Sequence, residues 1–458
     1  MNTTDLDLLI AEGKKEFRDI VFNSEISMCY MYFTQREIRF IDCEFNAKLV
    51  LSGLSNLEVS IIFHNCKFNQ VEVTSCILKG LRFGFIKQIQ ELNIFENSFD
   101  ELHIDSNSQP IVTNIYIDRT LVKNFISCSR LNISKGQFTL SVEKNKISQN
   151  ENFKCLFSGA RLDIISFSGF FGLNSNFDNL IVKSSTFQDC NFDKVSFNKS
   201  NLGDNIFHDC KFHSKAEFAN CEDLKTSNLK FKRCLFKGFT HFNESKFNCF
   251  DIQHTTFEKK TSFDRLETNT LKFYQVTFLQ STYFDELKIN KLNDRKYIKN
   301  LSIADAKDLR RSLRLIKHEL QKSENRIDYN RFRNYELKIH YQELKFKSNP
   351  VDTFILYTTK WSTNFGSWAW AFWFTILSGL FWYTILYFFE FYVALNLNNN
   401  ESYAQGVFRF FMVTDFSSPF LQKEYLNNGF SWTIFVLGKI FIAFGIYEMI
   451  QAFRKFKA

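Results

Sequence analysis

A short motif, Phe-x-x-Cys-x-Phe, recurs through the first two thirds of the chain and limits the folds open to it. It occurs at Phe40–Cys43–Phe45, Phe63–Cys66–Phe68, Phe187–Cys190–Phe192, Phe207–Cys210–Phe212 and Phe231–Cys234–Phe236. Related units carry Ser or Val in place of Cys, at Phe242–Ser245–Phe247 and Phe273–Val276–Phe278. Among them runs a frame with an apolar residue at every fifth position, namely Phe187, Phe192, Phe197, Leu202, Phe207 and Phe212. A period of five is neither the helical period of 3.6 nor the two-residue alternation of a flat strand.

A period of five fits a coil with four faces per turn, in which each face points one Phe or Leu inward. Such a turn takes about twenty residues, and no turn buries its core without its neighbours. Stacked turns place Phe over Phe in the interior, and the small Cys or Ser two residues earlier fills the space beside the rings. We therefore predict a mainly β solenoid over residues 40–292, with an N-terminal cap formed by residues 1–39.

The motif resembles the repeat of the pentapeptide-repeat family, as in Cys190-Asn-Phe192-Asp-Lys and Cys210-Lys-Phe212-His-Ser. The resemblance implies a right-handed β-helix of quadrilateral section. It is good over residues 185–280 and partial over residues 40–170, where Ile and Leu replace Phe and the frame slips. The earlier part remains open to a second interpretation, a more ordinary parallel β-helix. The resemblance implies a fold and says almost nothing about function.

Composition excludes several classes of protein. The 57 Phe, with only 3 Pro and 16 Gly, exclude disordered and collagen-like chains. All 11 Cys lie between Cys29 and Cys249. Because their number is odd and the first twenty residues hold no secretory segment, we predict reduced, buried thiols in a cytosolic compartment. A metal site is the alternative, but no Cys-x-x-Cys or His-x-x-x-His pair supports it, so we expect neither metal nor cofactor.

The net charge of +8 belongs to the last third of the chain. Residues 1–292 hold 35 Lys and Arg against 35 Asp and Glu, whereas residues 293–458 hold 22 against 14. Some pentapeptide-repeat proteins imitate duplex DNA with an acidic surface. A solenoid of zero net charge lacks that feature, so we expect no duplex DNA mimicry here.

The basic excess begins in a segment, residues 293–350, that is predicted to form an amphipathic helical linker. Leu309, Leu313 and Ile316 recur at helical spacing, and residues 323–330 have the composition of a turn between two helices. The basic side chains of the first helix are Arg310, Arg311, Arg314 and Lys317. They form either the solvated face of a helical hairpin or a collar that contacts anionic lipid headgroups at a membrane surface.

Two later segments, at about 365–393 and 429–450, predict transmembrane helices within a membrane domain of residues 351–458. Residues 361–389 carry no charge, and Trp361, Trp368 and Trp370 form an interfacial belt at the start of the first span. The flanking positive charges are Lys345, Lys347 and Lys360 before the first span, and Arg454, Lys455 and Lys457 after the second. The positive-inside rule then predicts a multi-pass protein of a bacterial inner membrane, with both termini and the solenoid in the cytoplasm.

Lys439 lies inside the second predicted span. It is eight residues from Tyr447, which is about 12 Å along a helix. A lysine stem covers only part of that distance by snorkelling. An ionisable residue at this depth usually faces a pore, a partner helix or an acidic residue, whereas a shifted span would let the amine reach the interface.

Between the spans, residues 402–422 are too apolar for an ordinary solvent loop and too short to cross a bilayer. Phe408, Phe410 and Phe411 precede the polar turn 414–418 and then Pro419. A half-helix followed by a polar turn is typical of a re-entrant loop, here at about 403–421, which is tolerated only inside protein or beside water. The alternative is a hydrophobic surface loop that caps the helix pair.

The order of span, re-entrant helix and span resembles the two-transmembrane pore module of ion channels. The potassium filter sequence Thr-Val-Gly-Tyr-Gly is absent, and residues 414–418 stand in its place, so a less selective pore is implied. One pair of spans cannot enclose a water path, so a pore requires a closed homo-oligomer, with a tetramer favoured. Lys439 and Asp415 would then form charged rings, and Glu390 and Asp415 would shape the outer mouth. The candidate pore and gate residues are Lys439, Thr414, Asp415, Glu390 and Arg409.

These patterns favour a membrane pore gated by a cytoplasmic solenoid rather than an enzyme, because no nucleophile, phosphate-loop or dinucleotide motif is present. The layout is similar to two-transmembrane effectors of bacterial anti-phage defence, which implies a nucleotide or oligonucleotide ligand on the solenoid. Stacking groups for that ligand would be Phe263, Tyr274, Tyr283 and Phe284. One alternative is a membrane-anchored scaffold that binds a protein partner without conductance. Another is a regulatory subunit whose Lys439 pairs with a partner's carboxylate.

Overall fold

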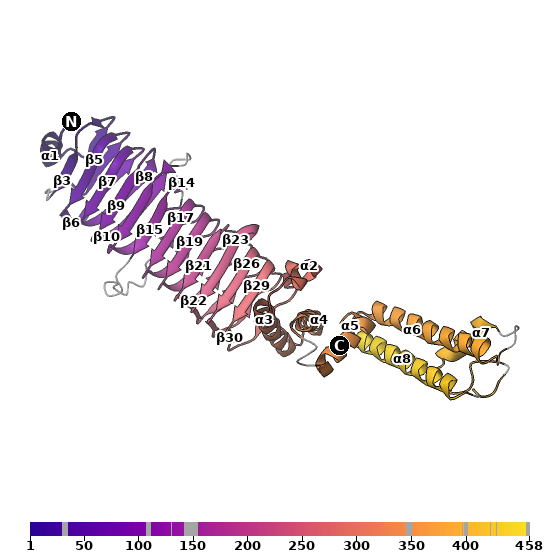
Figure 1. Cartoon of the computed structure of the whole chain (residues 1–458). Helices are drawn as coiled ribbons and strands as arrows, with labels where there is room; N and C mark the ends of the chain where they lie inside the picture. The colour runs from indigo at the N-terminus through magenta and orange to yellow at the C-terminus, as the bar shows by residue number, and fades with distance from the viewer. Residues whose placement is uncertain are drawn as a thin grey trace. The chain divides into compact units, whose positions relative to one another are not determined.

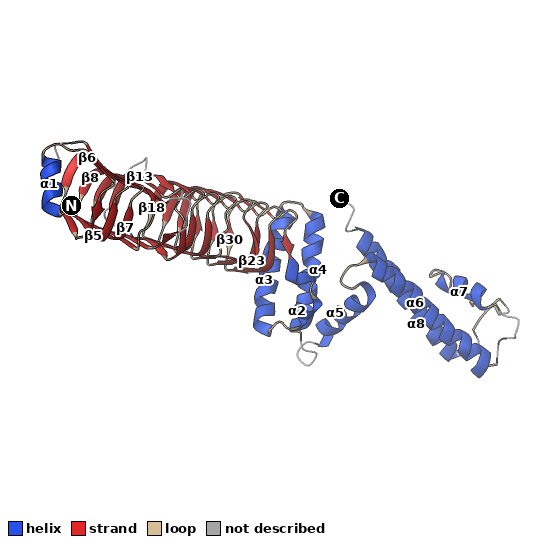
Figure 2. Ribbon diagram, turned by 90° about the horizontal axis from the view of Figure 1, so that it is seen from above, coloured by secondary structure: helices blue, strands red, loops and turns tan. Residues whose placement is uncertain are grey.

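The computed structural model describes residues 1–29, 35–106, 111–129, 131–141, 154–344, 350–395, 397, 402–421, 423–426 and 428–454. The chain divides into two compact units, Met1–Tyr297 and Ile298–Ala458. The first unit is β and the second is helical (Figure 2). The predicted fold class, a β-solenoid followed by helices, is confirmed.

The first unit is a parallel β-solenoid of about 12 turns, built on two long sheets (Figure 1). The first sheet contains, in order, β1 (Glu16–Arg18), β4 (Glu37–Ile41), β6 (Ser55–His64), β8 (Ile77–Ile86), β10 (Ser98–Ser106), β13 (Leu121–Ser127), β16 (Lys154–Leu156), β18 (Phe171–Asn176), β20 (Asn191–Ser196), β22 (Lys211–Glu217), β24 (Leu235–Phe236), β27 (Thr256–Phe257) and β30 (Thr277–Phe278). The second contains β2 (Val21–Phe22), β5 (Glu44–Ser52), β7 (Lys67–Thr74), β9 (Glu91–Phe95), β12 (Asn114–Asp118), β15 (Gln137–Ser141), β17 (Arg161–Ser168), β19 (Ile181–Gln188), β21 (Asp204–His208), β23 (Glu222–Lys232), β26 (Lys246–Gln253), β29 (Glu267–Tyr274) and β32 (Lys288–Ile289). Shorter strands complete some turns: β3 (Ile26–Cys29) beside β5, β11 (Ile111–Val112) beside β14 (Ile133–Lys135), and the series β25 (Phe239–His241), β28 (Thr261–Ser262) and β31 (Thr282–Tyr283).

Columns of stacked Phe rings fill the solenoid. Phe187, Phe207 and Phe231 occupy paired positions of β19, β21 and β23, and their ring centroids lie 4.6 and 4.9 Å apart. A second column runs through Phe192, Phe212, Phe236, Phe257 and Phe278. These columns contain Phe187, Phe192, Phe207 and Phe212 of the five-residue frame, and Phe197 stacks in a third column between Phe177 and Phe218, so the frame is the register in which one turn packs on the next.

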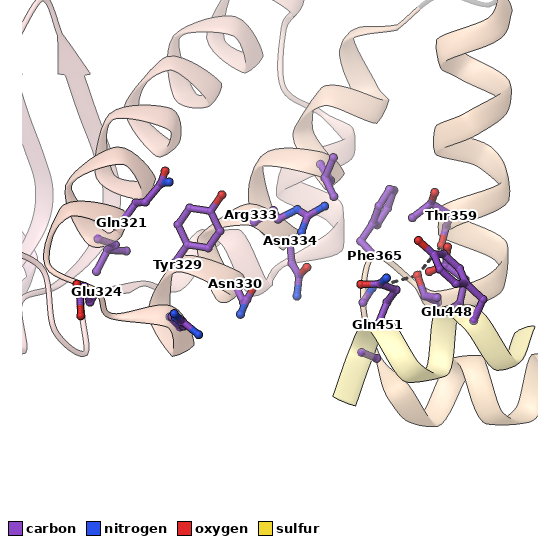
Figure 3. A pocket seen from close by; sticks show the side chains of 17 residues that line it. Gln321, Glu324, Tyr329, Asn330, Arg333, Asn334, Thr359, Phe365, Glu448 and Gln451 are labelled. Carbon is purple, nitrogen blue, oxygen red and sulfur yellow. Dashed lines mark hydrogen bonds between the residues drawn. The ribbon is translucent and has the colours of Figure 1, made fainter. Parts of the chain in front are cut away.

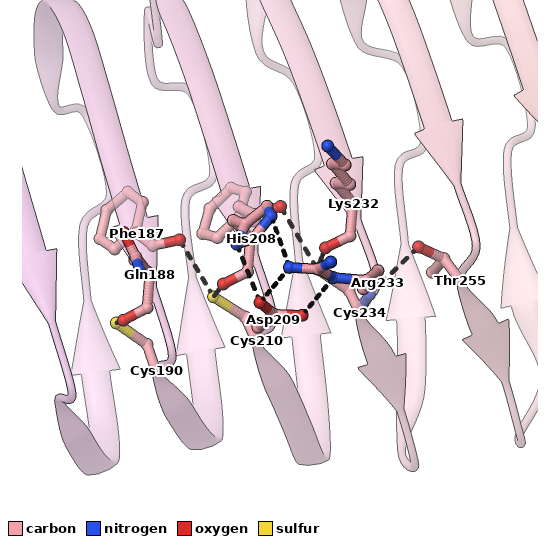
Figure 4. Close-up of polar contacts among 11 residues, drawn as sticks. Phe187, Gln188, Cys190, His208, Asp209, Cys210, Lys232, Arg233, Cys234 and Thr255 are labelled. Carbon is pink, nitrogen blue, oxygen red and sulfur yellow. Dashed lines mark hydrogen bonds and ion pairs between the residues drawn. The ribbon is translucent and has the colours of Figure 1, made fainter. Parts of the chain in front are cut away.

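The Cys of the motif lies at a corner of the coil, beside the rings. Figure 4 shows Cys190, Cys210 and Cys234 on successive turns. The Cys210 thiol donates to the carbonyl oxygen of Phe187 on the preceding turn at 3.2 Å. The residue before each of these Cys has a left-handed backbone, as at Asp209 with a φ of 56°, a conformation that Asp and Asn tolerate better than most residues. The small Cys side chain therefore closes the corner without displacing the rings.

All 11 Cys are free, and nine of them are buried. Burial raises the pKa of the Cys76 thiol to about 11, which keeps it protonated at neutral pH. The nine buried cysteines are packing residues of the coil, as predicted.

The solenoid begins earlier than the predicted boundary at residue 40. Strands β1 and β2 already pair with β4 and β5, and Phe17 stacks on Phe40 with the ring centroids 5.1 Å apart. Only α1 (Thr3–Ala11) forms a cap, and Leu6 and Ile10 are its buried residues. The predicted cap of residues 1–39 is therefore too long, because Phe17 lies 23 residues before Phe40 and outside the five-residue frame. After β32 follow η1 (Asn290–Asn293) and α2 (Arg295–Lys299).

The second unit contains a helical hairpin and a longer helix pair. The hairpin is α3 (Ile303–Lys322) packed on α4 (Arg326–Glu343). Next come α5 (Pro350–Thr363), α6 (Trp368–Phe388) with its π-helical end η2 (Phe389–Val393), α7 (Tyr403–Phe411) and α8 (Gly429–Arg454). The hairpin turn is shorter than the predicted 323–330, since α4 starts at Arg326 behind its cap residue Asn325.

Helix α5 is a separate helix that the sequence analysis did not predict. Residues 364–366 all have positive φ values and form a tight turn between α5 and α6. One face of α5 is apolar and exposed, with Val351, Phe354, Ile355 and Trp361 each more than half exposed. An apolar face without a protein partner is typical of a helix that lies on a membrane surface.

Candidate functional site

Helices α6 and α8 lie side by side (Figures 1 and 2). Together with the π-helical end of α6, they give two apolar segments, Trp368–Val393 and Gly429–Phe453, that are long enough to cross a membrane. They agree with the two predicted spans. Gly445 lets the helices approach closely, because a Cβ at this position would lie 2.3 Å from the hydroxyl oxygen of Thr375. Outward-facing side chains such as Trp373, Leu377 and Ile440 are more than half exposed.

Helix α7 packs against both long helices instead of capping their ends. A Cβ at Gly379 of α6 would lie 2.3 Å from the Phe411 ring, and a Cβ at Gly438 of α8 would lie 2.4 Å from the Phe410 ring. The other end of α7 is level with a later turn of α6, where the Tyr403 hydroxyl lies 2.8 Å from the Thr384 hydroxyl. The C-terminal end of α7 therefore lies beside the middle of α6 and α8.

Lys439 binds the C-terminal end of α7. Its ammonium group donates to the carbonyl oxygen of Met412 at 2.5 Å and to that of Arg409 at 3.5 Å. The rings of Phe410 and Phe435 flank the same nitrogen, with centroids at 5.5 and 5.0 Å. The last carbonyls of a helix lack intrahelical partners and carry partial negative charge, so they suit a cation. Lys439 is 3% exposed, and its charge is satisfied inside one chain.

The polar turn after α7 lies close to Lys439. Met412 accepts a second hydrogen bond at its carbonyl oxygen, from the Asp415 backbone N–H at 3.1 Å. The Asp415 carboxylate accepts hydrogen bonds from the backbone N–H and the hydroxyl of Ser417, at 2.9 and 2.5 Å. Thr414 and Arg409 are exposed. Of the predicted pore and gate residues, the structure thus brings together Lys439, Asp415 and the backbone of Arg409.

Glu390 forms a second buried site at the π-helical end of α6. Its side chain is fully buried, its carboxylate accepts a hydrogen bond from the Ser431 hydroxyl, and the Lys423 ammonium lies 3.8 Å from its other oxygen. We predicted that Glu390 shapes an outer mouth together with Asp415. Within a single chain, Glu390 connects η2 to the start of α8. A buried carboxylate requires hydrogen-bonding and charged partners, and Ser431 and Lys423 provide them.

The basic residues of the linker are paired within the hairpin. Arg314 and Lys317 both contact the Glu336 carboxylate, at 2.8 and 2.5 Å, and Arg310 lies 3.0 Å from a Glu343 oxygen. Arg311 pairs with Asp308 one turn earlier on α3. These contacts favour the hairpin interpretation over a lipid-binding collar, since three of the four charges are engaged by carboxylates of α4.

Glu336 gives the hairpin a predicted pH dependence. Burial alone would raise the pKa of Glu336, but hydrogen bonds from Lys317 and Arg314 outweigh it and hold the pKa below the ordinary value of 4.5. A carboxyl group whose pKa is lowered by folding stabilises the folded state at pH values above 4.5. That stabilisation is lost as the pH falls through the folded-state pKa. Glu336→Gln should therefore cost about 1–2 kcal/mol at pH 7 and much less at pH 3. Thermal unfolding followed by circular dichroism at the two pH values measures the difference.

The exposed Glu324, which forms no ion pair in the described part of the chain, provides the matched control. Glu324→Gln should leave the unfolding temperature almost unchanged at both pH values. An equal loss at pH 7 and pH 3 for Glu336→Gln would contradict the pairing with Lys317 and Arg314.

Two of the four predicted stacking groups are unavailable to a ligand. Phe263 and Phe284 are fully buried and stack on each other, with the ring centroids 4.8 Å apart. The prediction that they stack on a nucleotide is wrong, because they belong to a core column. Tyr274 contacts the ring of His254, and Tyr283 lies under the ammonium group of Lys260.

His208 belongs to a polar cluster on the solenoid, together with Asp209 and Arg233 (Figure 4). The Arg233 guanidinium lies 2.6 Å from an Asp209 oxygen on the preceding turn. No group of three His, Cys, Asp or Glu side chains among the described residues could hold a metal ion.

Two parts of the site escaped the sequence analysis. Lys423 was not linked to Glu390, because its segment carries no periodic pattern that would place it. The partners of Lys439 are backbone carbonyls, which leave no residue signature; only the apolar run of α7 pointed to this segment. Lys345, Lys347, Lys455 and Lys457, used for the topology prediction, lie outside the described residues, as does the side chain of Arg454.

A comparison of the chain with models of known protein families, with curated proteins and with solved structures finds no match.

Proposed function

We propose that the protein is an oligomeric membrane pore that opens by movement of α7, with the solenoid as its cytoplasmic sensor. The observation that carries the proposal is the position of α7, whose C-terminal carbonyls hold the buried Lys439 beside the middle of two apolar helices. A surface cap would need neither this depth nor a buried charge.

The depth of α7 supports a re-entrant element. Gly438 lies nine residues from the start of α8, and Gly379 lies fourteen residues from Val393. At the helical rise these separations are about 13 and 21 Å, and the hydrocarbon core of a bilayer is about 30 Å thick. The end of α7 would then lie near the bilayer midplane. Non-helical backbone at that depth, such as residues 412–418, is tolerated inside protein or beside water.

The polar groups of the helix pair support a conducting role. Lys439, Asp415 and the carbonyl oxygens of residues 409 and 412 form a connected polar group in otherwise apolar surroundings. Ionisable residues at such depth usually mark ion pathways or moving elements. Because Lys439 is covered by α7, a ring of charge around a pore would form only when α7 leaves this position. The resting arrangement corresponds to a closed pore.

One helix pair cannot enclose a channel, so the proposal requires several copies in a closed ring, and a homotetramer is the state we propose. The apolar exposed face of α5 would lie along the membrane surface beside the first span. There α5 would connect the cytoplasmic hairpin to α6. By analogy with membrane effectors of anti-phage defence, a nucleotide or oligonucleotide is the class of trigger proposed.

Reconstitution of the full chain into liposomes tests the proposal. We expect a tetramer by mass in detergent, a low ion flux for the wild-type protein without its trigger, and a raised flux for Gly438→Ala. The added methyl group would meet the Phe410 ring of α7 at 2.4 Å and the Trp382 Cβ of α6 at 2.9 Å, so it would displace α7 and loosen the contact between α6 and α8. Gly429→Ala is the matched control on the same helix, because a Cβ at Gly429 meets nothing within 4 Å. A monomer whose variants all give no flux would rule out the pore.

A membrane-anchored scaffold is the second candidate, and a specific observation favours it. Lys439 and Glu390 both find their partners inside one chain, so neither needs a pore or a second subunit. In that case α6, α7 and α8 form a rigid anchor, and the solenoid binds a protein partner. A monomeric mass together with unchanged liposome flux for Gly438→Ala would support this function over the pore.

A further inference from the structure

The helical unit contains a cavity of about 760 Å³ whose walls come from the hairpin and from the helix pair. Figure 3 shows Tyr329, Asn330, Arg333 and Asn334 of α4 on one side, and Thr359, Phe365, Glu448 and Gln451 on the other. The volume is within the range of about 300–1,000 Å³ that is usual for small-molecule sites. None of the predicted site residues lines this cavity.

Arg326 and Arg333 give the α4 wall an unbalanced positive charge. They are seven residues apart and lie on one face of α4 with Asn330 between them. In the described part of the chain neither guanidinium forms an ion pair, in contrast to Arg331 on the same helix, which pairs with Asp328 at 2.9 Å. Two free guanidinium groups on one wall are suited to an anion, because each can donate two parallel hydrogen bonds to a phosphate.

The remaining lining fits a phosphate ester better than a bare ion. The side-chain amides of Gln321, Asn334 and Gln451 are available as hydrogen-bonding groups, and the rings of Tyr329 and Phe365 provide apolar surface. Two carboxylates also line the cavity. Glu448 already has a partner within the chain, and Glu324 lies at the turn between α3 and α4. Glu324 forms no ion pair among the described residues, so two unpaired guanidinium groups stand against one unpaired carboxylate, and the net unpaired charge of the lining is positive.

We propose that this cavity binds a phosphate-bearing ligand, either the headgroup of an anionic lipid or a soluble phosphate compound such as a nucleotide. A ligand there would contact α4 of the hairpin and the end of α8 together. It would thus be placed to pass a signal from the hairpin to the helix pair. Binding itself requires no conductance, so this proposal and the pore can fail separately.

The test measures ligand binding to the full chain with two probes. Inorganic tripolyphosphate is titrated in detergent, and nanodiscs with phosphatidylglycerol are compared with nanodiscs of phosphatidylcholine alone. The readout is the thermal unfolding temperature of the helical unit, followed by Trp fluorescence. The wild-type chain should be stabilised by at least one probe, and Arg326→Gln/Arg333→Gln should weaken the response at least tenfold in probe concentration. A response to tripolyphosphate identifies a soluble ligand, and a response to phosphatidylglycerol alone identifies a lipid.

Arg311→Gln is the control, since Arg311 is an exposed arginine of the same hairpin that lies outside the cavity. It should respond like the wild-type chain. The unfolding temperatures of all variants without a probe show whether each has folded. The proposal is overturned if neither probe stabilises the wild-type chain, or if the double variant responds as Arg311→Gln does. Binding that depends on Arg326 and Arg333, in a chain that gives no ion flux in liposomes, would support the phosphate-binding cavity and contradict the proposed pore.

Discussion

Replacing Phe207 by Ala should lower the free energy of unfolding of the solenoid by about 3–5 kcal/mol. The ring is fully buried and stacks between Phe187 and Phe231, with centroids 4.6 and 4.9 Å away. It also meets Phe197 and Phe218 edge-on, at 5.6 and 5.7 Å. The cavity left by the ring would open between three successive turns. Strands paired in a parallel ladder cannot close such a gap by moving one side chain.

Urea unfolding of the full chain, followed by the circular dichroism of the β-sheet, measures this loss. Phe239→Ala is the matched control, because Phe239 lies in the same solenoid and its side chain is 52% exposed. We expect this control to lower the free energy by less than about 0.5 kcal/mol. Equal effects of the two substitutions would mean that the Phe columns do not hold the turns together.

The five-residue frame predicted these columns because each face of the coil places one side chain in the core at every turn. Where Phe recurs, as from Phe187 to Phe212, the sequence indicates both the fold and the register. Elsewhere the columns change residue type: Phe63 is followed by Phe83 and then by Ile104 at paired positions of β6, β8 and β10. A change of side chain hides the frame without breaking the ladder. One solenoid therefore runs through the region where the pattern is only partial.

The candidate site was predictable only in its outline. The apolar length of the spans and the isolated charge of Lys439 follow from the sequence, because a bilayer selects for length and apolarity. The carbonyl partners of Lys439 and the pairing of Glu390 with Ser431 join segments distant in sequence. No local pattern encodes such contacts. The sequence left the basic linker open to two interpretations for a related reason, since the Glu336 carboxylate on α4 pairs with Arg314 and Lys317 on α3.

Lys439→Met should release α7 from the helix pair. The substitution keeps the apolar stem and removes the ammonium group, so the carbonyl oxygens of Arg409 and Met412 lose the ammonium donor and keep only their backbone donors. A hydrogen bond to a charged group contributes about 1.5–3 kcal/mol, and helix-packing hydrogen bonds in membranes lie at or below the lower end of that range. We expect a loss of about 1.5 kcal/mol, which is about a tenfold rise in local opening. Hydrogen exchange of the amides of residues 403–411 in nanodiscs, followed by mass spectrometry, measures it.

Arg409→Gln separates this role of Lys439 from a general effect of charge. Arg409 is exposed, and only its backbone carbonyl takes part in the contact, so the substitution removes a nearby positive charge and leaves that contact in place. Exchange of α7 should remain at the wild-type rate. Unchanged exchange in Lys439→Met would show that Phe410 and the close approach at Gly438 hold α7 without the ammonium group. Faster exchange in Lys439→Met without a rise in liposome flux would show that the ammonium group holds α7 in a membrane anchor that does not conduct ions. Faster exchange with raised flux would make release of α7 the opening step.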